Sequence, residues 1–144
     1  MKLEELKKIC ELRFKDDKFI NHNDIYELLK PFARRYHNDS TGDIVSEDKI
    51  LFIQDRWGGT YKKPIFLDRV ALECEVLKES YGKSGQHTFT LKNINTNEIF
   101  LIKGRNLYKY VVLTKNRDNL KRAKLLDEKH FRGKKARVKN KTNF

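Results

Sequence analysis

The chain has 144 residues, of which 38% are hydrophobic and 36% are charged, and this composition suits one domain with a modest core. It has no apolar run of 18 residues and no apolar segment after its charged start, so we expect neither a membrane span nor a secretory signal. The two cysteines, Cys10 and Cys74, lack metal-ligand spacing and are interpreted as reduced, buried thiols of a cytoplasmic protein.

The first part of the chain, residues 1–45, is expected to be a helical segment. Apolar residues follow a helical period across 3–14, and a second helix is expected to begin at Asn23 or Asp24, where Asp24 could form a capping box with Glu27. Pro31 either kinks this second helix or opens a new turn. The pattern favours two helices packed on a sheet over a helix-turn-helix, because no third helix and no basic recognition face follow.

From residue 46 to residue 114 the apolar period changes to two, which indicates strands. The intervening segments, including 56–64 and 79–86, are rich in turn-forming residues. Short strands about every ten residues are typical of a small antiparallel barrel or sandwich. The expected strands cover residues 49–55, 70–77, 87–94, 98–104 and 107–114.

The last part, residues 115–144, is expected to be a basic helix followed by a tail. Asn116 or Asp118 could cap the helix, and a narrow apolar stripe follows. After Gly133 almost no apolar residue remains, which predicts disorder in isolation. The stripe consists of Leu120, Ala123, Leu126 and His130.

Charge is distributed very unevenly along the chain. Residues 1–102 hold 17 Lys and Arg against 17 Asp and Glu, whereas residues 103–144 hold 15 against 3. The formal net charge of +12 therefore lies in the last 42 residues. A dense cationic segment beside a neutral body favours nucleic-acid binding over a solubilising tail or a tail for acidic proteins or anionic membranes.

Catalytic motifs are weak in this sequence. The four histidines have no second histidine or cysteine at zinc-ligand spacing, and His87 and Thr90 would point to opposite faces of a strand. Glu47 and Lys49 fit half of a metal-dependent nuclease motif, with Asp39 or Asp43 as the partner, but such triplets arise by chance in a highly charged chain. We therefore expect a protein that is not an enzyme and uses no cofactor or metal.

Aromatic and cationic residues instead interleave in three segments of the sheet region, including the stretch KGRNLYKYVV at 103–112. Cations contact phosphates and aromatic rings stack on bases, so loops at one rim of a barrel could form a binding surface. The predicted nucleic-acid-binding residues are Arg56, Trp57, Tyr61, Lys62, Lys63, Lys83, Lys103, Arg105, Tyr108 and Lys109, joined by Lys121, Arg122, Lys134, Lys135 and Arg137 of the C-terminal segment.

Residues 70–112 resemble the SH3-like small barrels of KOW or Tudor type in their strand pattern and in the turn at Gly104. The whole chain, with its basic end, also resembles DNA-binding accessory proteins of tailed phages. These resemblances imply nucleic-acid binding. The expected fold is therefore α+β, with an N-terminal helical pair, a small antiparallel SH3-like β-barrel, and a C-terminal basic helix and tail.

The expected function is non-enzymatic binding of nucleic acid, duplex DNA before RNA, with weak sequence preference and a role in transcription or chromosome organisation. The expected location is the cytoplasm, at the nucleoid, or the host cytoplasm if a phage encodes the protein. Two alternatives stay open. One is an RNA-binding or ribosome-associated protein, and the other is a phage protein that docks on a host protein.

Overall fold

The structure, a computed structural model, describes residues 1–82, 85–115 and 119–142. Over these residues the protein is α+β, as predicted, with four α-helices and one open sheet of six antiparallel strands. No described helix has the length and apolarity needed to cross a membrane. The elements are α1 (Leu3–Phe14), α2 (His22–Leu29), the 3-10 helix η1 (Ala33–Arg35), β1 (Asn38–Asp39), β2 (Lys49–Gly59), β3 (Pro64–Tyr81), β4 (His87–Asn93), β5 (Ile99–Lys103), α3 (Gly104–Leu107), β6 (Leu113–Thr114) and α4 (Asn119–Thr142).

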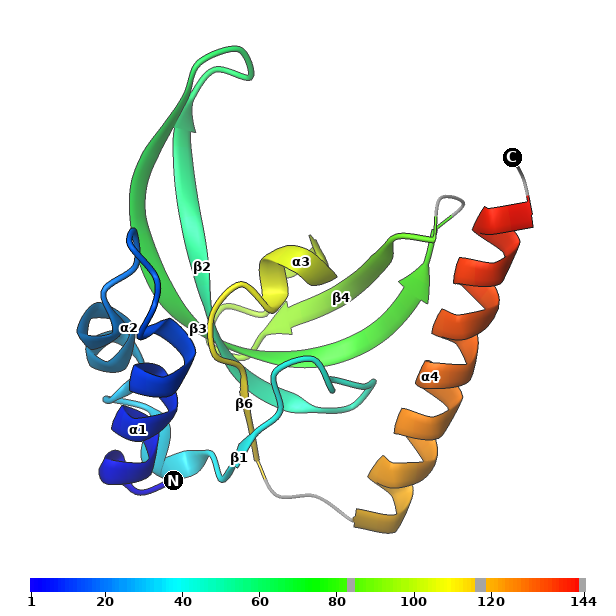
Figure 1. Cartoon of the computed structure of the whole chain (residues 1–144), viewed down its shortest axis with the longest axis horizontal. Coiled ribbons are helices and arrows are strands. Elements are labelled where there is room, and N and C mark those ends of the chain that lie inside the picture. The colour runs from blue at the N-terminus through cyan, green and yellow to red at the C-terminus, as the bar shows by residue number, and fades with distance from the viewer. Residues whose placement is uncertain (83–84, 116–118, 143–144) are drawn as a thin grey trace.

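The sheet has the strand order β1-β6-β2-β3-β4-β5. Strands β2 to β5 form a meander, and after α3 the chain returns so that β6 pairs with β2. The sheet curves strongly around α3 (Figure 1). It stays open, with β1 and β5 at its edges, so the closed SH3-like barrel expected from the sequence is not confirmed. The strands β1 and β6 have two residues each and extend the sheet too little for its edges to meet.

Strand β2 is buried on both faces. Four successive residues, Ile50, Leu51, Phe52 and Ile53, are at most 1% exposed. Because neighbouring side chains of a strand point to opposite faces, they enter two different cores. Leu51 and Ile53 join the core under α1 and α2, and Ile50 and Phe52 join the core between the sheet and α3.

The N-terminal helices pack together on one face of the sheet (Figure 1). Leu6 and Cys10 of α1 and Leu29 of α2 are fully buried there, which confirms the predicted helical pair on a sheet. The predicted capping box at Asp24 is wrong, because α2 begins at His22. Its N-cap is Asn21, whose side chain accepts a hydrogen bond from the Asn23 backbone at 2.9 Å.

The predicted loop at 56–64 is wrong for most of its length. Strand β2 continues to Gly59 and β3 starts at Pro64, so only a four-residue turn separates them. Gly59 has a φ of +79°, and a Cβ there would lie 2.4 Å from the Lys63 carbonyl oxygen, so the turn needs glycine. The result is a two-stranded hairpin that projects from the body (Figure 1).

The predicted strand at 107–114 is also mostly wrong. Residues 104–107 form α3, and only Leu113 and Thr114 pair in the sheet. The apolar run between them, at 110–112, is buried without forming a strand. An apolar run signals burial, but strand formation also needs an unpaired neighbouring strand, and only two residues of this segment find one.

Helix α4 continues to Thr142, through the segment after Gly133 where disorder was expected. The predicted apolar stripe does not hold it, because Leu120 is 85% exposed and His130 is also exposed. Its buried face contains Lys129 and Gly133 instead. The predicted caps at residues 116 and 118 lie outside the described residues.

Gly133→Ala tests how α4 packs. In an isolated helix this change would add about 1 kcal/mol of stability. Here the new Cβ would lie 2.6 Å from the hydroxyl oxygen of Tyr81. The Tyr81 ring is held in place, because it stacks on the His87 ring with 4.4 Å between centroids. We expect a loss of about 1 to 3 kcal/mol in the unfolding free energy from urea titration, and faster amide exchange in α4. Adding Tyr81→Phe, which removes the clashing oxygen, should restore part of the loss. A single variant more stable than the parent would contradict this packing.

Candidate nucleic-acid interface

The outer part of the β2–β3 hairpin, residues 56–67, is called here the hairpin arm. It contains five of the residues predicted to bind nucleic acid. Arg56 donates two hydrogen bonds to Asp68, at 2.6 and 2.5 Å, so its charge is neutralised within the sheet. The rings of Trp57 and Phe66 pack edge to face with 5.5 Å between centroids, while the indole stays 56% exposed. The arm is thus braced by one ion pair and one aromatic pair.

The turn of the arm presents the other three predicted residues to solvent. Tyr61 is fully exposed. Lys62 and Lys63 are also exposed, and residues 56–67 contain no Asp or Glu. Backbone hydrogen bonds between Thr60 and Lys63, at 3.3 and 3.2 Å, close the turn. The arm therefore ends in an ordered turn with two cations and one free aromatic ring.

A groove of about 450 Å³ lies between β2 and β5, next to the segment after α3, and is called here the β2–β5 groove. It brings together three predicted residues that are distant in the sequence, Trp57, Lys103 and Lys109. Gln54, Leu101 and Asn106 also line the groove and were not predicted from the sequence. Their contribution depends on the curvature of the sheet, for which local sequence carries no signal.

Asp55 at the groove holds Lys109 in place. Its carboxylate accepts hydrogen bonds from the Lys109 ammonium at 2.5 Å and the Tyr110 hydroxyl at 2.7 Å, and Arg69 lies 3.3 Å away. Burial opposes ionisation of Asp55, but these hydrogen bonds outweigh it and hold its pKa below the ordinary value. Lys109 is exposed but committed to an ion pair with Asp55, whereas Lys103 is an exposed cation of the groove for which no such pair is seen among the described residues.

The stretch 103–112 divides into a cationic surface and a core. Lys103 and Arg105 are exposed at the start of α3, and Leu107 and 110–112 are buried. Tyr108, predicted to contact nucleic acid, has a structural role. Its hydroxyl accepts hydrogen bonds from the Ile44 backbone at 3.1 Å and from Lys129 at 3.0 Å, and burial raises its pKa.

Helix α4 divides its cations between folding and solvent. Arg122 donates to the Asp43 carbonyl oxygen at 2.5 Å and lies 3.3 Å from the Asp48 carboxylate, and Arg132 pairs with Glu79. Lys134, Lys135 and Arg137, which were predicted to bind nucleic acid, are exposed. Lys83 and the side chain of Lys121 lie outside the described residues.

Lys129 is the most unusual cation, with 3% exposure. Its ammonium donates to the Gly42 carbonyl oxygen at 3.1 Å and to Tyr108, and lies 5.8 Å from the centre of the Phe89 ring. Burial is the main cause that lowers its pKa to about 8, against the attraction of Asp43 and Asp48. This role was not predicted, because nothing in the sequence distinguishes a buried lysine from the exposed lysines of a basic helix.

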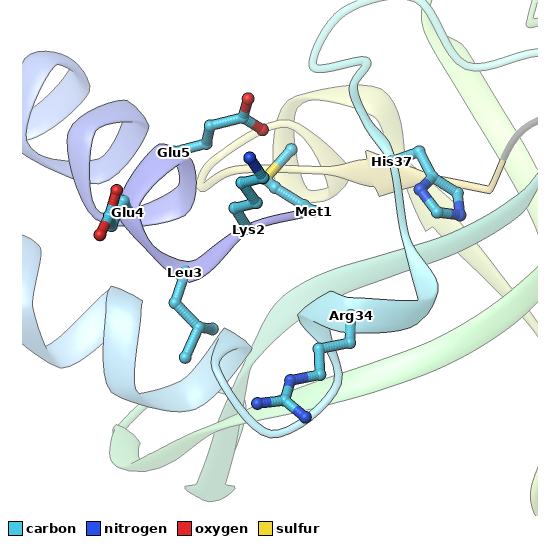
Figure 2. Close-up of a pocket in the computed structure, with 7 residues that line it drawn as sticks. All are labelled: Met1, Lys2, Leu3, Glu4, Glu5, Arg34 and His37. Atoms are coloured by element: carbon cyan, nitrogen blue, oxygen red, sulfur yellow. The ribbon is translucent and has the colours of Figure 1, made fainter.

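A second pocket lies at the start of α1 (Figure 2). Its side chains point in different directions, with Arg34 directed away from Glu4 and Glu5. They do not converge on a common point, so the pocket offers no arrangement for binding a specific ligand.

The half nuclease motif at Glu47 and Lys49 gains no metal site from the described residues, among which no three His, Cys, Asp or Glu side chains gather as possible metal ligands. Both cysteines are buried and free, and burial raises the pKa of Cys10 to about 11 and that of Cys74 to about 12. They are therefore held as thiols rather than reactive thiolates near neutral pH.

Comparisons with protein-family models, with curated proteins and with solved structures found no match for this chain.

The buried ammonium of Lys129 predicts a specific pH dependence. Its pKa is about 8 in the folded protein and 10.5 ordinarily, so its contribution to stability grows as pH rises from about 8 to 10.5 and is lost as pH falls through 8. Lys129→Met lacks this titration. Between pH 8 and 10 we expect the unfolding free energy of the wild type to gain roughly 2 to 3 kcal/mol relative to that variant.

Urea titrations of both proteins across this pH range measure the difference. The buried thiols of Cys10 and Cys74 oppose stability at high pH, but both proteins contain them, so their effect cancels. Parallel pH profiles for the two proteins would contradict a buried, charged Lys129.

Proposed function

We propose that the protein is a non-enzymatic nucleic-acid-binding protein that prefers duplex DNA and has weak sequence preference. The observation that carries this proposal is a set of exposed cations at the turn of the arm and at the start of α3. Lys62, Lys63, Lys103 and Arg105 are exposed there, and no ion pair within the described residues neutralises them. Such cations are available to phosphates, which supply most of the affinity in non-specific binding.

The shape of the hairpin favours a duplex over a single strand. A two-stranded ribbon fits a groove of duplex DNA, and several DNA-binding folds use strands in this way. The five residues from Asp55 to Gly59 extend roughly 17 Å at about 3.4 Å per residue, enough to span a groove. Binding of a single strand would need a row of stacking aromatic rings. Of the residues predicted to stack on bases, the arm exposes two, Trp57 and Tyr61, which is too few for such a row.

The strand order supports a finer proposal about the fold. Strands β2 to β5 form a meander, and the single helical turn of α3 follows. Strand β6 then returns to pair with β2, the first strand of the meander. This order is consistent with an open variant of an SH3-like barrel. With the resemblance to KOW or Tudor barrels and to phage accessory proteins, this favours a role in transcription or chromosome organisation at the nucleoid.

Fluorescence anisotropy with matched duplex DNA, single-stranded DNA and RNA, from low salt to about twice physiological, tests the proposal. We expect the duplex to bind most tightly and its affinity to fall steeply with salt. A clear preference for RNA would replace duplex DNA by the RNA-binding alternative. Absence of binding to all three at low salt would refute the proposal.

A charge-matched pair of variants locates the surface. Replacing Lys62, Lys63, Lys103 and Arg105 with alanine should reduce the slope of log affinity against log salt by about 3 to 4, because each phosphate contact contributes about 0.9. The control replaces four exposed cations of the N-terminal segment, Lys7, Lys8, Lys15 and Lys18, and should leave the slope nearly unchanged. Equal effects of the two variants would mean that binding depends on net charge and has no defined surface.

A protein partner is the second candidate, and one observation favours it. Ile65 and Leu67 are 58% and 60% exposed, an unusual amount of apolar surface for one hairpin. Binding of nucleic acid that is weak and lost at physiological salt would favour this candidate.

A further inference from the structure

Phosphate neutralisation leaves one feature of the hairpin arm unexplained, which is its apolar surface. Five large apolar side chains within it are 42% to 100% exposed. Both faces of the arm are apolar, and among the described elements none covers its end (Figure 1). The five are Trp57, Tyr61, Ile65, Phe66 and Leu67.

The arm is built to hold these side chains in fixed positions. Trp57 packs against Phe66 on one face of the arm. On the other face Leu67 lies over Gly58, and a Cβ at Gly58 would be 3.2 Å from the Cδ1 atom of Leu67. The tight turn at Gly59 then places Tyr61 at the end of the arm. Ile65 pairs with Gly58 across the hairpin and lies two residues after the turn. An ordered support of this kind lowers the entropy cost of inserting the end of the arm into a partner.

The charge of the arm identifies the kind of partner. Residues 56–67 contain three cations and no Asp or Glu, and Arg56 is neutralised by Asp68. The two remaining cations, Lys62 and Lys63, lie in the turn between Tyr61 and Ile65. Apolar side chains next to cations complement a groove in which base pairs lie between two lines of phosphates.

We propose that the hairpin arm enters the minor groove of duplex DNA and inserts Tyr61 and Ile65 at a base step, which bends the duplex. This inference rests on the proposed function and adds the mode of binding. Apolar wedges that unstack a base step from the minor groove bend DNA by about 20° to 90°. Lys62 and Lys63 contact the phosphates on either side. Flexible pyrimidine–purine steps are the preferred sites, since they unstack most easily.

The test measures DNA bending separately from affinity. A duplex of 30 base pairs with one central TA step carries a donor and an acceptor dye at its ends, and energy transfer is read at saturating protein. We expect the full-length wild type to raise the transfer efficiency. Tyr61→Ser with Ile65→Ser should bind at least about tenfold more weakly and leave the saturated duplex straight. Both side chains are exposed, so the melting temperature should not change.

Lys62→Ala with Lys63→Ala is the matched control on the same turn. It should weaken binding and reduce the salt slope by about 2, yet bend the duplex as the wild type does once saturated. A straight duplex with saturating wild type would overturn the insertion. So would a serine variant that bends DNA normally, and the apolar end would then be assigned to a protein partner. In both cases measurable binding would leave the proposed function intact, whereas no binding by the wild type at low salt would refute the proposed function itself.

Discussion

The burial of β2 on both faces is the constraint on which the structure depends. Ile50 to Ile53 are excluded from water, so the sheet needs a cover on each side. Helices α1 and α2, with Tyr110 and Val111, supply one cover, and α3 with Val112 supplies the other. Removing so much apolar area from water is the main stabilising contribution in a chain with 36% charged residues. Tyr110 still reaches Asp55 with its hydroxyl, and Trp57 and Phe66 still line pockets shared with the body. Beyond these residues the same two strands continue as a hairpin that projects from the body (Figure 1), and its end is the part of the sheet available to a partner.

The charge of the chain serves folding as well as binding. The segment 103–144 carries the whole formal excess of cations, but Lys109, Arg122, Lys129 and Arg132 are committed to Asp55, Asp48, the Gly42 carbonyl oxygen and Glu79. Basic helix α4 thus packs on a neutral body through polar contacts where most helices use an apolar stripe. The candidate interface is defined by the cations that remain exposed. The net charge of the chain therefore overstates the number of cations available to bind nucleic acid.

The sequence predicted the parts of the fold that depend on local periodicity. The helical pair and the centres of β2 to β5 follow from the apolar pattern. The errors share one physical cause, which is that tertiary contacts override local composition. Glycines and lysines at 56–64 look like a loop, but pairing across the hairpin extends the strands. The segment after Gly133 is too polar to fold in isolation and is helical in the structure. Within the site, Trp57 and Lys103 were identified from composition, whereas the groove partners Gln54 and Asn106 needed the curved sheet.

The central claim is that the hairpin arm and the start of α3 form the nucleic-acid surface. A ¹⁵N–¹H correlation titration of the protein with a short duplex tests it most directly, since each backbone amide reports its own surroundings. The account predicts shifts concentrated in residues 56–67 and 103–105, with smaller shifts at 134–137 and none in α1 or α2. Shifts concentrated in the helical pair, or scattered over all exposed lysines without preference, would contradict it.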